Sequence, residues 1–149
     1  MSPATSYPQE QPTAALNPHL ATTVNGIPFA LPVLNASGAF YAPGFARFFQ
    51  LNQGLGGIVT KTVTDAPSMG NKPYRTVELP GIGMLNSIGI QNPGLDACLV
   101  DEIPGLAGHQ LPVILSISAH SVERFQAMAQ RVASHPSAAH IQALELNLS

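Results

Sequence analysis

Polar side chains gather where the apolar stretches of this sequence end. Four such stretches have the composition of buried strands, and each is followed by hydroxyl, amide or charged groups. In chain order these groups are Asn35, Ser37 and Gly38; Lys61 and Thr62; Ser116 and Ser118; and Glu145, Asn147 and Ser149. The carboxyl ends of parallel strands meet at one edge of a sheet, where α/β proteins bind ligands. The pattern favours a ligand site of hydrogen-bonding groups, although Ser and Asn at strand ends also serve in ordinary turns.

Lys61 adds a positive charge to this set. It follows the apolar run "GIVT" and stands where the predicted strand ends. One interpretation is a lysine that is simply solvated. The other is an ammonium group held over an anionic ligand or an electron-rich cofactor.

The stretch "GMLNSIGIQNPG", residues 83–94, is too polar for a core strand and too apolar for an ordinary surface loop. It carries three glycines, one proline and the amides Asn86, Gln91 and Asn92. Glycine lets a backbone approach another group closely. The composition therefore suits a segment that offers uncharged hydrogen bonds at short range.

The elements that must position these groups alternate between strands and helices. Asn25-Gly26 lies between two apolar runs and predicts a β-hairpin with a two-residue turn. Beyond it we expect strand, helix, strand, long loop, helix, strand, helix and strand. In chain order these are residues 31–38, 43–52, 56–63, 64–82, 92–108, 111–118, 121–135 and 141–149. This alternation predicts a parallel sheet with helices packed on it.

Two of the helices have recognisable ends. Asn92 and Pro93 suit the cap and the first residue of one helix, and Pro104 is expected to interrupt it. Ser121 is expected to cap the other. Its predicted apolar stripe is Val122, Phe125, Met128, Ala129 and Val132.

Composition excludes several classes of protein. The chain has 149 residues, enough for one domain, and 45% of them are hydrophobic. Its net charge is -2 and it has no basic run, so nucleic acid is not an expected partner. No apolar run reaches the ~18 residues that suggest a membrane span. The first 20 residues lack the marks of a secretory or mitochondrial signal, so we expect a disordered tail and a cytoplasmic protein.

Common cofactor and metal motifs are missing. The sequence contains neither a complete G-x-G-x-x-G nor a P-loop. Its five histidines lack metal-ligand spacing, so no metal is expected. Cys98, the single cysteine, lies on the apolar face of a predicted helix and is interpreted as a buried structural thiol.

Five motifs in order carry a resemblance to a known family. They are "NASG", "GGIVTKTVT", "GNKPYR", "GMLNSIGIQNPG" and "ALELNLS". Together they resemble the class 1 dihydroorotate dehydrogenases, which are FMN-dependent (β/α)8 barrels of pyrimidine biosynthesis. The similarity spans roughly residues 28–149, about half of a barrel of ~250 residues. It implies an α/β fold, namely a partial TIM barrel of about the first four strands with an N-terminal hairpin. We therefore expect a tail at 1–20 and the N-terminal half of such a barrel at 21–149.

The resemblance also implies roles for individual residues. Ser37, Lys61, Thr62 and Asn147 match positions at the FMN. The substrate positions are Lys61, Asn86, Ser87, Ile88, Gly89, Ile90 and Asn147. Asn86 would meet the pyrimidine ring, and backbone N–H groups near Gly89 would meet the carboxylate of orotate. We expect Ser37, Lys61, Asn86 and Asn147 to converge at one rim of a curved parallel sheet.

The resemblance leaves the catalytic base unassigned. In class 1 members the base is a cysteine just after "LNLS", and this chain stops at Ser149. The implied activity is oxidation of dihydroorotate to orotate, with fumarate or a partner flavoprotein as electron acceptor and a homodimer for the full-length protein. The 149-residue chain itself is expected to be inactive. Two alternatives stay open, a dihydropyrimidine dehydrogenase-like flavin domain and a non-catalytic truncated barrel.

Overall fold

The computed structural model describes residues 18–39 and 54–149. The helix expected at 43–52 and most of the expected N-terminal tail lie outside these residues. The last part of that tail, η1 (Pro18–Leu20), forms a 3-10 helix. The expected hairpin is confirmed, because β1 (Thr22–Val24) pairs antiparallel with β2 (Ile27–Phe29) around Asn25-Gly26.

A parallel sheet forms the centre of the fold. Its strands are β3 (Ile58–Val59), β6 (Val113–Ser118) and β7 (Ala143–Asn147), in that spatial order. Leu34 forms a parallel bridge with Gly57 and so continues the sheet beyond β3. Four chain segments thus lie side by side in sequence order. This is the arrangement that the first part of a (β/α)8 barrel requires.

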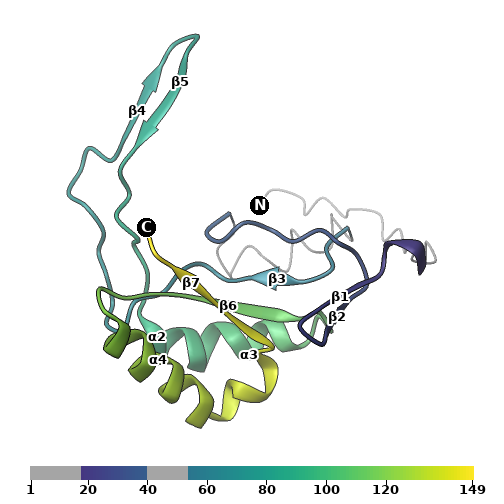
Figure 1. Ribbon diagram of the computed structural model, residues 1–149. Helices are drawn as coiled ribbons and strands as arrows, with labels where there is room; N and C mark the ends of the chain where they lie inside the picture. The colour runs from purple at the N-terminus through teal and green to yellow at the C-terminus, as the bar shows by residue number, and fades with distance from the viewer. Residues whose placement is uncertain (1–17, 40–53) are drawn as a thin grey trace, which may run out of the picture.

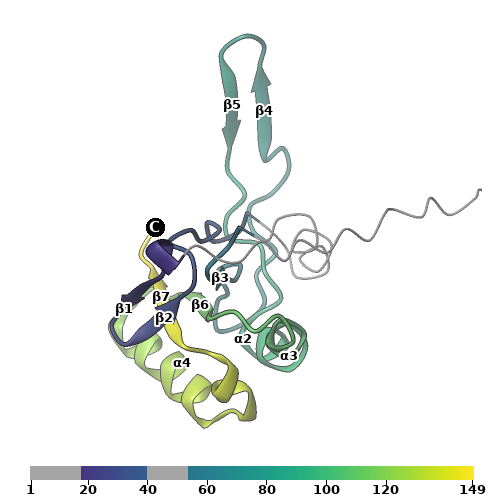
Figure 2. The same ribbon diagram turned by 90° about the vertical axis from the view of Figure 1, so that its right-hand side faces the viewer.

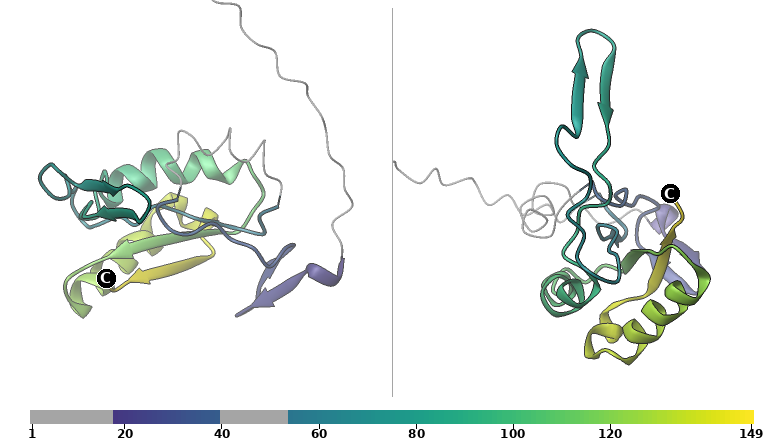
Figure 3. Two further views of the ribbon diagram at one scale, coloured as in Figure 1. Left: turned by 90° about the horizontal axis from the view of Figure 1, so that it is seen from above. Right: turned by 90° about the vertical axis from the view of Figure 1, so that its left-hand side faces the viewer.

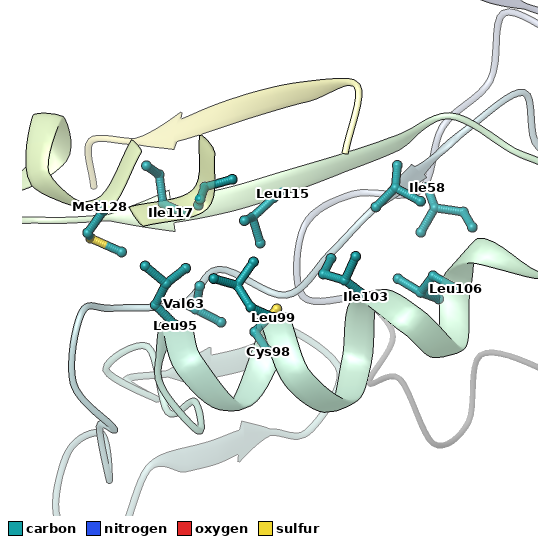
Figure 4. Close-up of a cluster of buried hydrophobic side chains, with 12 residues drawn as sticks. Ile58, Val63, Leu95, Cys98, Leu99, Ile103, Leu106, Leu115, Ile117 and Met128 are labelled. Atoms are coloured by element: carbon teal, nitrogen blue, oxygen red, sulfur yellow. The ribbon is translucent and has the colours of Figure 1, made fainter. Parts of the chain in front are cut away.

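The helices cover one face of this sheet (Figures 1 and 2). One continuous helical stretch consists of α2 (Leu95–Ala97), the π-helical segment η2 (Cys98–Glu102) and α3 (Ile103–Ala107). The other described helices on this face are α4 (Val122–Ser134) and the 3-10 helix η3 (Pro136–His140). Figure 4 shows Leu95, Leu99 and Ile103 directed toward Leu115 and Ile117 of β6. The apolar core therefore lies between the sheet and these helices.

Three details of the predicted helices are wrong. Asn92 does not cap a helix, since the first helix begins at Leu95 behind Gly94. Pro104 does not interrupt the helical stretch. Before it, Ile103 N–H donates to the Cys98 carbonyl and completes a π-helical turn. Pro104 itself lies in the first turn of α3, where proline is tolerated. Val122 is 77% exposed because no described element covers the first turn of α4. The cap at Ser121 is confirmed, as its hydroxyl accepts from Arg124 N–H.

The segment 64–92 forms a long arm rather than an irregular loop. Its outer part is an antiparallel hairpin of β4 (Thr76–Leu79) and β5 (Gly83–Asn86). Closer to the sheet, Asn71 N–H donates to the Ile88 carbonyl, and Ser68 pairs with Asn92. The arm projects from the molecule at the end opposite the β1–β2 hairpin (Figures 1 and 3).

Candidate functional site

The site begins with a β-bulge at Lys61 and Thr62. Val59 pairs with Ile114, but Val63 pairs with Ile117, so the β3 side holds one more residue than the β6 side. Thr60 N–H donates to the Ile114 carbonyl at 3.0 Å, and Val63 N–H donates to the Ser116 carbonyl at 2.9 Å. Bulges re-aim side chains and occur often beside functional sites. Next to this bulge, the Thr62 side chain joins a polar network, whereas the Lys61 side chain lines a cavity.

The Thr62 hydroxyl is the centre of a polar network. Its Oγ1 atom lies 2.9 Å from Ser37 Oγ, 2.9 Å from Ser116 Oγ and 3.0 Å from Asn147 Nδ2. These partners come from three different strand ends. The structure therefore brings together Ser37, Thr62 and Asn147, three of the predicted cofactor-binding residues.

A carboxylate ends this network on the inner face of the sheet. Ser116 Oγ donates to Glu145 Oε1 at 2.7 Å, and Ser116 is fully buried. Glu145 and Asn147 are two positions apart on β7, so they share a face, while Leu144 packs against the apolar core. The face opposite the helices is thus lined by hydrogen-bonded polar groups.

Asn35 holds the first segment at this rim. Its Nδ2 atom donates to the Val59 carbonyl at 2.7 Å, and its Oδ1 atom accepts from Val59 N–H at 2.9 Å. The side chain replaces the backbone pairing that a strand at 31–38 would have supplied. Ser37, two residues on, also donates to the Thr60 carbonyl at 3.1 Å. A buried amide therefore fixes the position of Ser37.

Lys61 lies on the other side of the bulge, at a cavity of about 700 Å³. Residues of the arm form most of its described wall, and among the described lining residues Lys61 alone is ionisable. The lining residues are Gly38, Lys61, Pro67, Ser68, Met69, Ile88, Gln91, Asn92 and Pro93. A Cβ atom added at Gly38 would lie 3.7 Å from Lys61 Nζ, so the two residues face each other. The cavity combines one positive charge with a largely apolar wall.

The residues of the predicted substrate loop, 86–90, do not share one site in the structure. Asn86 is exposed on β5 opposite Thr76 and is not among the residues that line the Lys61 cavity. Ser87 accepts from Asn71 Nδ2 at 2.7 Å. Ile88 lines the Lys61 cavity, whereas Gly89 and Ile90 line a second cavity. That cavity also contains Ser118, His120 and Ser149. Asn86 is the one of the four residues expected to converge that the structure does not bring to the rim.

Asn92 closes the base of the arm. Its Oδ1 atom accepts from Thr64 N–H and Gly94 N–H, and its Nδ2 atom donates to Thr64 Oγ1 and the Ile90 carbonyl. This buried amide connects the end of the β3 segment to the loop that precedes the first helix. Sequence reasoning missed this role because Asn92-Pro93 also matches a helix cap.

Other candidate chemistry is weak in the described part of the chain. Burial raises the pKa of the Cys98 thiol far above its usual range, and the Glu102 carboxylate raises it further. Burial likewise raises the pKa of Glu102. Cys98 is therefore an inert core thiol, as expected. Residues 18–39 and 54–149 contain no cluster of His, Cys, Asp and Glu able to hold a metal, and no helix among them is long and apolar enough to cross a membrane.

A parallel sheet with helices on one face and polar strand ends at one rim defines part of an α/β barrel with a ligand site at its carboxyl end. The sequence profile of the family "dihydroorotate dehydrogenase" matches residues 19–149. The chain therefore belongs to the dihydroorotate dehydrogenase family, as the motifs indicated.

Individual relatives agree with this assignment. The chain is 40% identical over 131 residues to the proteins named dihydroorotate dehydrogenase B (NAD(+)), catalytic subunit, of Bacillus caldolyticus and Geobacillus kaustophilus. These matches cover 87% of this chain and 40% of each relative, so the chain spans about two fifths of the length of the curated relatives.

Solved structures confirm the fold. The ligand-free dihydroorotate dehydrogenase of Eimeria tenella matches with a TM-score of 0.68 and 21% identity, over 92% of this chain and 40% of that one. The complex of the Eimeria tenella enzyme with ferulenol gives a TM-score of 0.66. The predicted partial barrel is thus confirmed.

Proposed function

We propose that this chain supplies the first half of the flavin and pyrimidine site of an enzyme that oxidises dihydroorotate to orotate with FMN. One observation carries the proposal. The Thr62 hydroxyl joins Ser37 and Asn147 from separate strand ends, and Lys61 stands beside it at the lining of a cavity. Membership in the dihydroorotate dehydrogenase family supports the substrate.

The chemistry of these residues fits an isoalloxazine ring. The pyrimidine edge of that ring presents carbonyl oxygens and one N–H, which neutral hydroxyl and amide groups can bind. An ammonium group near the same edge stabilises the negative charge of a reduced ring. Ser37 and Asn147 would hold the ring, with Lys61 beside it. FMN would supply the electron-accepting chemistry, and these residues would orient and polarise its ring.

The arm would provide the substrate side of the site. Ile88 and Met69 form part of the apolar wall of the Lys61 cavity. Such a wall excludes water, which strengthens the attraction between the Lys61 ammonium and the carboxylate of dihydroorotate. Ser87 is tied to Asn71, so the loop is held on both sides of Ile88. We include Asn86 among the substrate residues only through the resemblance, since it lies outside this cavity.

The names of the relatives bear on the electron acceptor. The relatives from Bacillus and Geobacillus are catalytic subunits of an NAD(+)-type enzyme. We therefore favour an NAD-linked partner subunit over fumarate as the acceptor in the full-length protein. A homodimer of the catalytic chain is compatible with this arrangement.

A binding titration tests the proposal. The purified 149-residue chain is titrated with FMN while flavin fluorescence is followed, first alone and then with orotate or uracil present. We expect FMN to bind and orotate, not uracil, to tighten binding. Failure of the soluble, folded chain to bind FMN would refute the flavin assignment, and preference for uracil would favour a dihydropyrimidine dehydrogenase-like domain.

A further inference from the structure

The hydrogen bonds of the inner polar network have a direction that the side-chain chemistry determines. Ser116 Oγ donates to Glu145 Oε1, since an ionised carboxylate has no proton to give. A hydroxyl has one proton and two lone pairs. The single hydroxyl proton of Ser116 is therefore used in the hydrogen bond to Glu145. The contact between Ser116 and Thr62 must then be donated by Thr62.

The same reasoning determines the direction of each hydrogen bond of Thr62. Its single proton goes to Ser116, so the contacts with Ser37 and Asn147 must both be accepted by Thr62 Oγ1. One donated and two accepted bonds use the full capacity of a hydroxyl. Thr62 is also buried. It consequently has no hydrogen bond left for a ligand and acts as a connector.

Ser37 and Asn147 then present opposite polarities at the rim. The single Ser37 proton is shared between Thr62 Oγ1 and the Thr60 carbonyl, so only the lone pairs of Ser37 can meet a ligand. Asn147 uses one Nδ2 proton on Thr62, and its Oδ1 atom accepts from Ser149 N–H and Ser149 Oγ. Its second Nδ2 proton remains for a ligand. An acceptor thus stands beside a donor.

We propose that the Glu145 carboxylate sets this polarity through Ser116 and Thr62, and so makes the rim selective for a ring that carries an N–H next to a carbonyl. Glu145 is a positioning residue in this view, because it acts only through other side chains. The inference rests on the proposed function for the identity of the ring. The direction of the hydrogen bonds does not depend on that identity.

The replacement Glu145→Gln tests the relay. The amide can donate to Ser116, which then donates to Thr62 and forces the Thr62 proton onto Ser37. One lone pair of Ser37 is thereby lost to the ligand. We expect the dissociation constant for FMN to rise about 5- to 10-fold, the equivalent of one net hydrogen bond. Glu102→Gln is the matched control, since Glu102 is also a half-buried glutamate but contacts Cys98 instead; it should change the constant less than twofold.

A double-mutant cycle separates a relay from a merely structural effect. Once Ser37→Ala has removed the hydroxyl, adding Glu145→Gln should weaken FMN binding no further. Equal additive losses would overturn the proposal. So would an unchanged dissociation constant in folded Glu145→Gln.

A ligand-free measurement keeps the two proposals distinguishable. A hydroxyl that donates to a carboxylate forms a strong, charge-assisted bond, and its proton resonates downfield. In NMR spectra of the labelled wild-type chain we expect such a resonance from Ser116, and its upfield movement in Glu145→Gln but not in Glu102→Gln. Its absence in the wild type refutes the relay even if Glu145→Gln does not fold. Its presence in a chain that fails to bind FMN refutes only the flavin assignment.

Discussion

At the scale of single residues, the hydroxyl oxygen of Thr62 connects the side chains of the rim. It satisfies Ser37, Ser116 and Asn147 at once, and both Thr62 and Ser116 are buried. Thr62→Val keeps the shape and removes the hydroxyl. Because a buried polar group without a partner costs about 1–3 kcal/mol, we expect a loss of that size in the free energy of unfolding measured with urea.

A second threonine provides the control for this substitution. Thr76 is exposed on β4, where a β-branched apolar residue suits a strand. Thr76→Val should leave the unfolding free energy within about 0.5 kcal/mol of the wild type. If both variants behave alike, the network around Thr62 contributes nothing to stability.

Lys61 carries the charge of the proposed site. Lys61→Ala should raise the dissociation constant for FMN about tenfold or more, because a hydrogen bond to a charged group contributes about 1.5–3 kcal/mol. Lys72→Ala removes an exposed lysine from the arm and serves as the control. Fluorescence titration at two salt concentrations measures both. Equal effects of the two substitutions would mean that Lys61 acts only through the net charge.

The residues of the rim were predictable in part. Polar groups at strand ends pointed to Ser37, Thr62 and Asn147, which the structure joins. Their contacts were not predictable, because they depend on a one-residue bulge directly after β3 that has no sequence signature here. Glu145 was visible as part of a strand end, but its partner Ser116 is 29 positions away in sequence.

At the scale of elements, the helices and strands with a buried apolar face were predictable from the sequence, and the exposed hairpin was not. Residues 113–118, 122–134 and 143–147 were all predicted, since each has an apolar face that packs in the core. The β4–β5 hairpin was missed because both of its faces are exposed and carry no periodic apolar signal. The position of Asn86 on β5 was not predictable for the same reason, because its motif identifies the loop but not the hairpin.

The arm depends on close backbone approach at Gly89. Its φ angle is +77°, and a Cβ atom there would lie 2.7 Å from Asn71 N. Gly81 has a φ angle of +73° but open space around the same position. Gly89→Ala and Gly81→Ala therefore share the cost of a left-handed alanine, about 1–2 kcal/mol, and only the first adds a clash.

Limited proteolysis measures this difference. Trypsin cleavage after Arg75, within the arm, reports how often the arm opens. We expect Gly89→Ala to be cleaved about tenfold faster than Gly81→Ala, since a further 1–2 kcal/mol of clash changes the open population by a factor of roughly 5–30. Similar rates in the two variants would show that the contact between Gly89 and Asn71 does not hold the arm.

At the scale of the whole molecule, the two faces of the sheet differ in kind. The helix-facing side holds the apolar cluster, whereas the inner side holds hydroxyl, amide and carboxylate groups. Barrel interiors are usually filled with branched apolar side chains. Here the inner layer near the rim is polar, and its hydroxyl groups donate in sequence from the rim toward the Glu145 carboxylate. The apolar core thus lies on one face of the sheet, and the hydrogen-bonding groups of the proposed site lie on the other.

The end of the sheet gives the last prediction. Among the described strands β7 pairs only with β6, and its Leu146 is 53% exposed. Open strand edges with apolar side chains promote self-association, which charged residues prevent. We expect the 149-residue chain to associate in sedimentation velocity experiments, and Leu146→Lys to shift it toward the monomer. Val122→Lys, which places the same charge at an exposed apolar position of α4, should not. If both lysines dissociate the chain equally, added charge is responsible and the β7 edge is not the contact.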